Sequence, residues 1–189
     1  GARKPFDVSR TLAPGDANVL ARYATFCSTV GRFAEATDAI GKALQLDPLN
    51  PAMYNSAGFV QYSARHYAEA IPLYKKALAL NPKLPFAHAS IGNSLFGLGK
   101  YREARTEYIA EPLDVLRLPA LAIVERKLGN EAAARGALDN LTTERGDGAS
   151  YQQAQILSQW GQVDEALGEL EHAARIGDTG ITNARNDPM

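Results

Sequence analysis

Cysteine, histidine and tryptophan are scarce in this sequence, which has one Cys, three His and one Trp among 189 residues. The single cysteine, Cys27, cannot form an intramolecular disulfide or supply a cysteine-rich zinc site. The histidines His66, His88 and His172 stand far apart and show no His-Glu-x-x-His spacing. We therefore expect neither a metal site nor any other bound cofactor.

An excess of charge of either sign is also missing, and so are long apolar runs. The 20 Lys and Arg residues nearly balance the 21 Asp and Glu residues, which leaves a net charge of −1. A chain with this balance has no bulk electrostatic attraction for nucleic acid or anionic lipid. No apolar run approaches the ~20 residues that a membrane-spanning helix needs. We expect no nucleic-acid partner and no membrane insertion.

Hydrophobic residues, in contrast, make up 46% of the chain, which is enough to build a core and excludes intrinsic disorder. A six-residue pattern, Gly-Arg-Phe-Ala-Glu-Ala at 31–36, recurs at 65–70 and at 99–104, each time after 34 residues. Weaker copies follow at 129–134 and 161–166, after 30 and 32 residues. The chain is therefore an array of similar units.

Each unit is predicted to contain a helix, a tight turn, a second helix and a proline stop. A glycine opens four of the five copies of the pattern, where a left-handed residue would close the first helix. Asp47-Pro48 and Asn81-Pro82 would end the second helix, because proline cannot continue it. Small residues recur where the two helices of a unit must approach closely, as Ala24, Gly58, Gly92, Ala122 and Ala154 in the first helix and Ala36, Ala70, Ala104, Ala134 and Ala166 in the second.

This pattern resembles the tetratricopeptide repeat (TPR) over roughly residues 17–180. The resemblance implies an all-α fold, a right-handed superhelical solenoid of antiparallel helix pairs in which the first helix of each pair lines a concave groove. It also implies about five repeats, near 17–50, 51–84, 85–114, 115–146 and 147–180.

Both ends of the chain are expected to be cut. Residues 1–16 are predicted to be a remnant helix of a preceding repeat, and residues 181–189 a truncated C-terminal tail. The stretch 151–156, followed by Gly177-Asp178 and by Asn-Asp-Pro at 186–188, is similar to the C-terminal repeat modules of bacterial winged-helix regulators and class III nucleotidyl cyclases. That similarity implies an effector domain in a longer parent protein.

One irregularity is expected in the third unit. Glu111-Pro112 interrupts its second helix, and Glu111 occupies the position that holds Ala43 and Ala77 in the two units before it. Pro119 follows within the first turns of the next helix. We expect a shortened or kinked element near 109–114, either as a spacing adjustment between strong and weak repeats or as a hinge.

Residues that could converge on a reaction are not evident. The stretch 92–100 departs from a phosphate-binding loop, because Ser94 replaces a required glycine and Tyr101 stands where Ser or Thr must bind magnesium. No Ser, His and acid trio can be assembled, and acidic pairs such as Asp164-Glu165 are typical of solvated helix faces. We therefore expect a protein without enzymatic activity.

The resemblance predicts which first-helix residues face the groove. Aromatic side chains supply contact area at low entropic cost, and Asn side chains can donate to and accept from an extended peptide backbone. A clamp for C-terminal carboxylates is not favoured, because Ala21 and Thr25 fill the positions that such clamps give to Lys and Asn. The predicted peptide-binding groove comprises Asn55, Phe59, Tyr62, Phe86, Asn93, Phe96, Ile123, Arg126, Tyr151 and Gln155, and Asn18, Ala21, Thr25 and Ser28 of the first unit face the same side.

Two functions from different classes remain open. The leading hypothesis is a protein–protein interaction scaffold that binds a peptide or partner domain in its groove. The alternative is a regulatory sensor module of a bacterial multidomain signalling protein whose effector domain is absent from this chain. Self-association through the cut ends is a further expectation, because terminal repeats lack a neighbour that covers their apolar face.

Overall fold

The computed structural model describes residues 15–178 and 180–181, and every regular element in this part of the chain is helical. The chain forms two compact units, Gly1–Leu98 and Gly99–Met189, which we describe separately. The predicted remnant helix over 1–16 and tail over 181–189 lie outside the described residues, apart from residues 15, 16 and 181.

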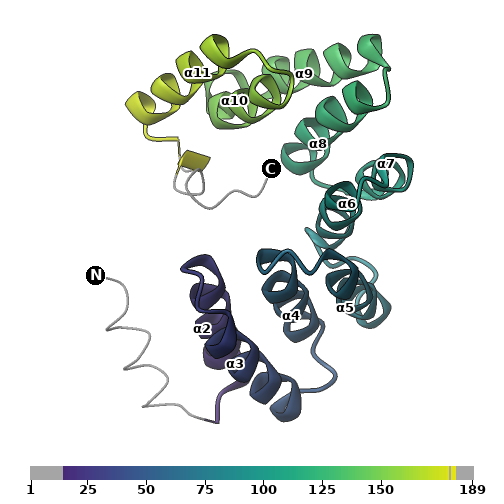
Figure 1. Cartoon of the computed structure of the whole chain (residues 1–189), viewed down its shortest axis with the longest axis vertical. Helices are drawn as coiled ribbons and strands as arrows, with labels where there is room; N and C mark the ends of the chain where they lie inside the picture. Colours follow the sequence, from purple (N-terminus) through teal and green to yellow (C-terminus); the bar gives the residue numbers. More distant parts are fainter. Residues whose placement is uncertain (1–14, 179, 182–189) are drawn as a thin grey trace. The chain divides into compact units, whose positions relative to one another are not determined.

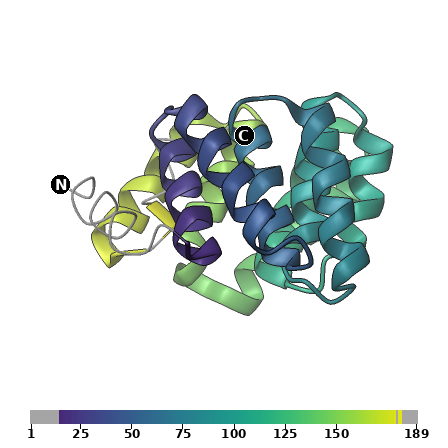
Figure 2. The same ribbon diagram turned by 90° about the horizontal axis from the view of Figure 1, so that it is seen from below.

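The first unit contains two helix pairs followed by a single helix. The first pair is α2 (Ala17–Thr29) with α3 (Phe33–Leu46), and the second is α4 (Pro51–Ser63) with α5 (Tyr67–Leu80). Helix α6 (Ala87–Gly97) packs against α5, and α2 packs against α4 (Figure 1). Figure 2 shows α2 to α5 standing side by side.

The second unit begins with α7 (Tyr101–Ala110), which packs against α8 (Asp114–Lys127). Helix α8 pairs with α9 (Glu131–Arg145), which the short 3-10 helix η1 (Gly146–Ala149) connects to the last pair. That pair consists of α10 (Ser150–Gln159) and α11 (Val163–Ile176), and α10 also packs against α8.

The predicted glycine turns are confirmed. Gly31, Gly99, Gly129 and Gly161 all have φ between 73° and 81°, in the left-handed region where glycine carries no steric penalty. The second repeat has Arg65 at this position, and Arg65 takes the same conformation with φ of 63°. Its N–H donates to the carbonyl of Tyr62 at 2.8 Å, so the turn forms without glycine.

The predicted contacts at small residues are confirmed as well, because all ten of these residues are buried. Gly58 shows why a small residue is needed. A Cβ added to Gly58 would lie 2.6 Å from Cε1 of Tyr74 on α5, closer than real Cβ contacts allow. The second helix of each pair therefore presses a large side chain against a position that holds no bulk in the first.

The predicted irregularity near 109–114 is also confirmed. Helix α7 ends at Ala110 and has 10 residues, whereas α3 and α5 have 14. Glu111 is fully buried, as Ala43 and Ala77 are at the equivalent positions. Its Oε1 accepts a hydrogen bond from the backbone N–H of Leu113 at 3.2 Å, next to the first residue of α8. The carboxylate thus satisfies a helix-terminal N–H that has no partner within α8.

Candidate functional site

An open groove of about 730 Å³ lies between α2 and α4 in the first unit. Its walls are mostly apolar, and the polar groups among its lining residues are neutral except for one guanidinium. The lining residues are Asn18, Ala21, Arg22, Thr25, Phe26 and Thr29 of α2 and Ala52, Met53 and Ser56 of α4.

Side-chain caps fix where the two walls begin. Oδ1 of Asp16 accepts hydrogen bonds from the N–H groups of Asn18 and Val19, at 2.8 and 3.2 Å, and starts α2. Oδ1 of Asn50 accepts from the N–H of Ala52 at 3.0 Å and starts α4. Asn and Asp are favoured N-caps because they satisfy donors that the helix leaves unpaired. The lining residues near both helix starts are therefore held at defined positions.

A polar cluster ties α2 to α3 behind the groove. The Tyr23 hydroxyl donates to Oε2 of Glu35 at 2.9 Å and accepts from the guanidinium of Arg32 at 3.2 Å, and Arg32 also pairs with Glu35. Burial raises the pKa of Tyr23 to about 12, so this side chain is a neutral donor at physiological pH. The cluster makes α2 a rigid wall.

The hydroxyl groups in the groove are arranged as acceptors. Thr25 Oγ1 donates to the carbonyl of Ala21 at 3.0 Å, and Thr29 Oγ1 donates to the carbonyl of Thr25 at 3.0 Å. A hydroxyl has one donor hydrogen and two lone pairs, so these groups can still accept hydrogen bonds from a ligand. Arg22 is exposed at the groove and contributes donors. The groove therefore suits a ligand that presents N–H groups along an otherwise apolar surface.

Asn55 follows the lining residues on α4 and adds a further acceptor. Its Oδ1 is buried and has no hydrogen-bond partner. An unpaired buried acceptor costs on the order of 1–3 kcal/mol, so a ligand N–H that reaches this amide would recover that energy. Rotation about the last torsion of the side chain is enough to turn the amide toward a neighbouring donor.

The other predicted residues of the first unit lie on α4 and α6, which pack against each other. Phe59, Tyr62, Asn93 and Phe96 are half-buried, and the Tyr62 ring centroid lies 5.5 Å from that of Tyr67 on α5. Phe86 differs, because it is the N-cap of α6 with φ of 70°, and it is exposed. The first unit thus brings Asn55 and Phe59 onto the helix that forms one wall of the groove.

The remaining predicted residues belong to the second unit and are not joined to this groove. Ile123 on α8 and Tyr151 on α10 are both buried, so neither side chain is available at the surface of that unit. Gly180 covers Tyr151, since a Cβ there would lie 2.6 Å from its ring. Gln155 on α10 is half-buried.

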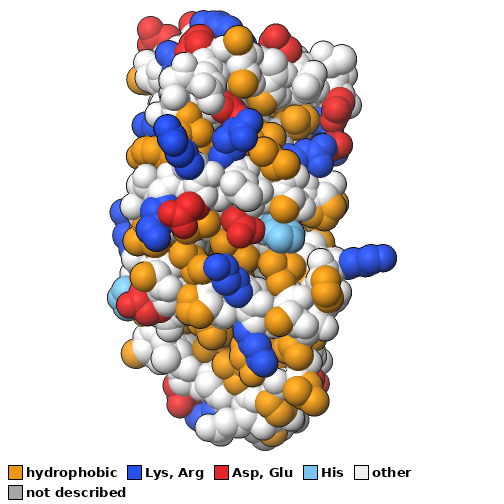
Figure 3. Space-filling model, turned by 90° about the vertical axis from the view of Figure 1, so that its right-hand side faces the viewer, with side chains coloured by type: hydrophobic (Ala, Val, Ile, Leu, Met, Phe, Trp, Pro, Cys, Tyr) orange, Lys and Arg blue, Asp and Glu red, His pale blue; other side chains and the backbone are white. Residues whose placement is uncertain are grey.

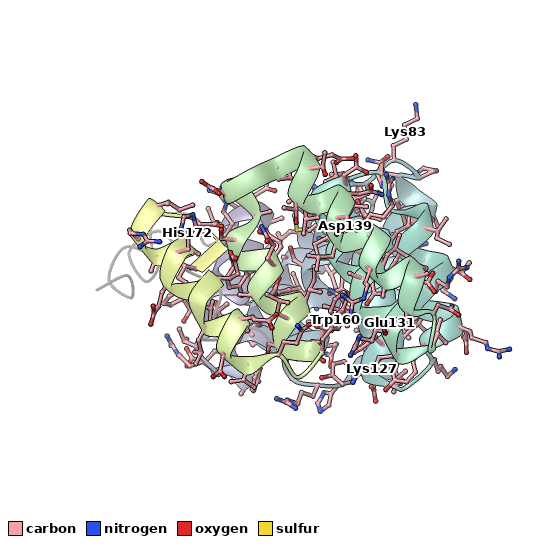
Figure 4. All side chains as sticks on the ribbon, turned by 90° about the horizontal axis from the view of Figure 1, so that it is seen from above. Lys83, Lys127, Glu131, Asp139, Trp160 and His172 are labelled. Atoms are coloured by element: carbon pink, nitrogen blue, oxygen red, sulfur yellow. The ribbon has the colours of Figure 1, made fainter. Side chains whose placement is uncertain are left out.

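Arg126 on α8 takes part in a structural cluster in the second unit. Its guanidinium lies 5.0 Å from the ring centroid of Trp160 and pairs with Glu131 at 2.5 Å. Trp160 Nε1 donates to the carbonyl of Ala122 at 3.3 Å and so joins α10 to α8. Figure 4 shows Trp160 beside Glu131 and Lys127 at the turn between α8 and α9. Arg126 is therefore engaged in packing between helices.

Six lining residues were not predicted from the sequence. A signal for some of them exists, because Arg22 and Thr29 follow Asn18 and Thr25 by four residues and so share their helix face. Phe26, Ala52, Met53 and Ser56 could not be assigned in this way, since their exposure depends on how α2 and α4 are spaced.

Other kinds of site have no support among the residues that the structure describes. No group of three or more His, Cys, Asp or Glu side chains there could hold a metal ion. None of the helices described is long and apolar enough to cross a membrane. The face drawn in Figure 3 shows basic and acidic side chains interspersed with apolar ones, in keeping with the net charge of −1.

Helix pairs joined by tight turns, with small residues at their contacts, define a helical-repeat protein, a class whose stacked first helices provide extended binding surfaces. Residues 29–85 match a family described as tetratricopeptide repeat. With this match and the fold, we place the chain in the tetratricopeptide-repeat family. No curated protein sequence shows a significant match to the chain.

Solved structures of similar fold include three that differ in partners. YrrB, described as a TPR protein with an unusual peptide-binding site, has a TM-score of 0.58 and 21% identity over 96% of this chain and 98% of its own. PilF from Pseudomonas aeruginosa has a TM-score of 0.65 and 17% identity over 90% of this chain and 78% of its own. A chain of the APC/C hetero-tetramer Cut9-Hcn1 has a TM-score of 0.67 and 13% identity over 89% of this chain and 34% of its own.

Proposed function

We propose that this chain is a non-enzymatic protein–protein interaction scaffold, and that it binds an extended peptide segment of its partner in the groove between α2 and α4. The observation that carries this proposal is the groove itself, with its apolar walls and its row of hydrogen-bond acceptors. Its volume of about 730 Å³ lies in the range of ~300–1,000 Å³ that is typical of ligand-binding clefts.

The backbone of an extended peptide provides the donors that these acceptors require. Successive N–H groups of such a peptide point alternately to opposite sides, so one side can meet Thr25 and Asn55 while apolar side chains contact Met53. Main-chain hydrogen bonds would then supply affinity, and the apolar pockets would select side chains.

Half-buried aromatic residues offer a continuation of this path along the first unit. Phe59 on α4 and Phe96 on α6 belong to neighbouring helices, and Asn93 lies on the same helix as Phe96. Aromatic side chains provide large contact areas with few rotatable bonds, as is common at peptide-binding surfaces. We propose that residues of the peptide beyond the groove contact these two aromatic rings.

The chemistry of the groove also limits the ligand. Arg22 is the charged residue among those that line it, and the others are neutral. One exposed guanidinium contributes little to the binding of an acidic segment, because solvent screens it. The favoured ligand is therefore a largely apolar peptide with at most one acidic side chain, rather than a polyacidic tail.

A peptide library displayed on phage and selected on the whole chain provides a probe for this proposal. The affinity of the selected peptide is then measured by fluorescence anisotropy for the wild type, Thr25→Arg and Thr37→Arg. Thr25→Arg fills the groove and should weaken binding at least ~10-fold. Thr37→Arg makes the same change on the exposed face of α3 and should leave the affinity unaltered. Equal binding by all three proteins, or failure to select a peptide, would overturn the proposal.

A second pair of substitutions tests the path beyond the groove. Phe59→Ala combined with Phe96→Ala should keep the helical circular dichroism and weaken the same peptide. Loss of helical signal in this double variant would mean that the two rings are core, and retention of full affinity would mean that the peptide does not reach them.

A further inference from the structure

Helix α11 carries an apolar face that the described part of the chain leaves uncovered. Val163 is 60% exposed and Leu167 is 53% exposed, and Ala174 is also exposed. Together with half-buried Leu170 they follow the spacing of one helix face, at intervals of four, three and four residues. We call these four residues the α11 stripe.

The same chain shows what such a face is built for. Helix α5 has Tyr67, Ile71, Tyr74 and Leu78 at the four equivalent positions, and α6 packs over them. Tyr67 lies against Gly97 of α6, because a Cβ there would be 2.7 Å from its ring, and Tyr74 is fully buried and hydrogen-bonded to Ser90. The α11 stripe is therefore a helix-packing face without a helix.

The described residues that follow α11 do not supply this helix. Gly177 ends α11 in a left-handed conformation, and the chain then turns back onto α10. The backbone N–H of Tyr151 donates to Oδ2 of Asp178 at 3.2 Å, and Gly180 lies against the ring of Tyr151. This segment covers the start of α10 and leaves Val163 and Leu167 exposed.

Charges along one edge of the stripe are arranged so that the face complements itself. At 100° per residue, Asp164, Glu171 and Arg175 lie along the same edge, with Asp164 near the start of α11 and Arg175 near its end. In an antiparallel pair of α11 helices, this edge of one copy lies beside the same edge of the other. Asp164 of each copy then faces Arg175 of the other, while Val163 meets Ala174 and Leu167 meets Leu170.

We propose that the α11 stripe is the contact of a homodimer, in which a second copy of this chain packs its α11 antiparallel against the first across a two-fold axis. A two-fold contact uses the same patch on both copies and closes, so it produces a dimer and not a filament. This surface is separate from the groove residues, and the proposal does not depend on the peptide ligand.

The size of the contact sets its expected strength. Helix α11 has 14 residues and is about 21 Å long. One helix pair of that length buries less than the ~1,200 Å² that marks stable complexes. The dimer is therefore reversible, with dissociation in the micromolar to millimolar range.

Sedimentation velocity of the whole chain, from ~1 µM to ~1 mM, measures this equilibrium. The wild type should shift from monomer to dimer as its concentration rises. Leu167→Glu places charges in the contact and should raise the dissociation constant at least ~10-fold. Leu49→Glu is the matched control, since Leu49 is exposed in the turn between α3 and α4 and should leave the dimer intact. A wild type that stays monomeric, or a Leu167→Glu variant that dimerises normally, would overturn the proposal.

A charge reversal tests the antiparallel arrangement itself. Asp164→Arg and Arg175→Asp each place like charges opposite one another and should weaken the dimer. The double variant restores opposite charges across the two-fold axis and should recover most of the wild-type affinity. If the double variant is at least as weak as the single variants, the antiparallel pairing is wrong, even if a dimer forms.

Discussion

The ring of Tyr74 on α5 lies against Gly58 on α4 so closely that a Cβ on Gly58 would be 2.6 Å from it. Tyr74 is fully buried, so its ring has no solvent-filled space into which it could move. This contact joins the two helices of the second repeat, which form one wall of the groove and its support. It also yields a direct test of the packing scheme.

Gly58→Ala should destabilise the chain by about 1–3 kcal/mol, because the added methyl group overpacks the contact with Tyr74. Gly41→Ala provides the matched control on α3. A Cβ there meets nothing within 4 Å, so the substitution should stabilise the helix by about 0.5–1 kcal/mol. Urea unfolding followed by circular dichroism measures both changes, and an equal effect of the two would contradict the role assigned to Gly58.

Arg65→Gly should stabilise the chain by about 1 kcal/mol. Arg65 has φ of 63°, where an L side chain is strained and glycine is not. Gly161→Ala makes the opposite change at φ of 81° in the fifth repeat and should destabilise by a similar amount. Thermal unfolding of the two variants against wild type checks the pair of signs.

The ion pair between Arg105 and Glu125 should matter more than an exposed one. The Glu125 side chain is only 5% exposed, whereas that of Arg105 is 44% exposed, and Glu125 also accepts from Asn130 at 2.6 Å. Arg105→Ala would leave a buried carboxylate with less compensation and should cost about 2 kcal/mol. Lys42→Ala breaks an exposed pair with Asp38 and should change the free energy of unfolding by less than ~0.5 kcal/mol. Comparable losses from both variants would contradict this difference in burial.

Unfolding at high pH should depend on Tyr74. Burial raises the pKa of Tyr74 in the folded chain above its ordinary value of about 10. The neutral hydroxyl thus favours the folded state, and this contribution is complete below pH ~10 and is lost as the pH rises toward the folded-state pKa. Stability should therefore fall above pH ~10, with a smaller slope in Tyr74→Phe. An identical alkaline slope in both proteins, from urea unfolding at several pH values, would contradict the assignment.

Much of the fold follows from local features of the sequence. The glycine turns, the proline stops and the small residues at helix contacts each depend on a steric constraint within one repeat, so Gly31, Ala36 and Pro48 report it directly. The early end of α7 could likewise be predicted, because Pro112 cannot continue a helix.

The location of the groove could not be predicted from assigned positions alone, because it depends on differences in side-chain volume between repeats. Ala21 and Thr25 on α2 occupy the positions that Asn55 and Phe59 occupy on α4. The smaller pair leaves a hollow at α2 that the larger pair would fill. A comparison of volumes at these positions would have pointed to the first repeat rather than to the aromatic cluster alone.

Burial of the predicted residues in the second unit has a different cause. Tyr151 is covered by Gly180, which lies 29 residues further along the chain, and Ile123 lies on α8, against which α10 packs. Repeat intervals of 30 and 32 residues also shift the register of these repeats from the regular 34. Positions carried over from the regular repeats therefore do not identify surface residues here.

The most direct test of the central claim is a titration of the ¹⁵N-labelled chain with the selected peptide, followed by amide chemical-shift changes. Binding in the groove predicts that the largest changes fall in α2 and α4, around Thr25 and Ser56, with smaller changes along α6. Largest changes in the outer helices α3 and α5, or in the second unit, would contradict a peptide-binding groove between α2 and α4.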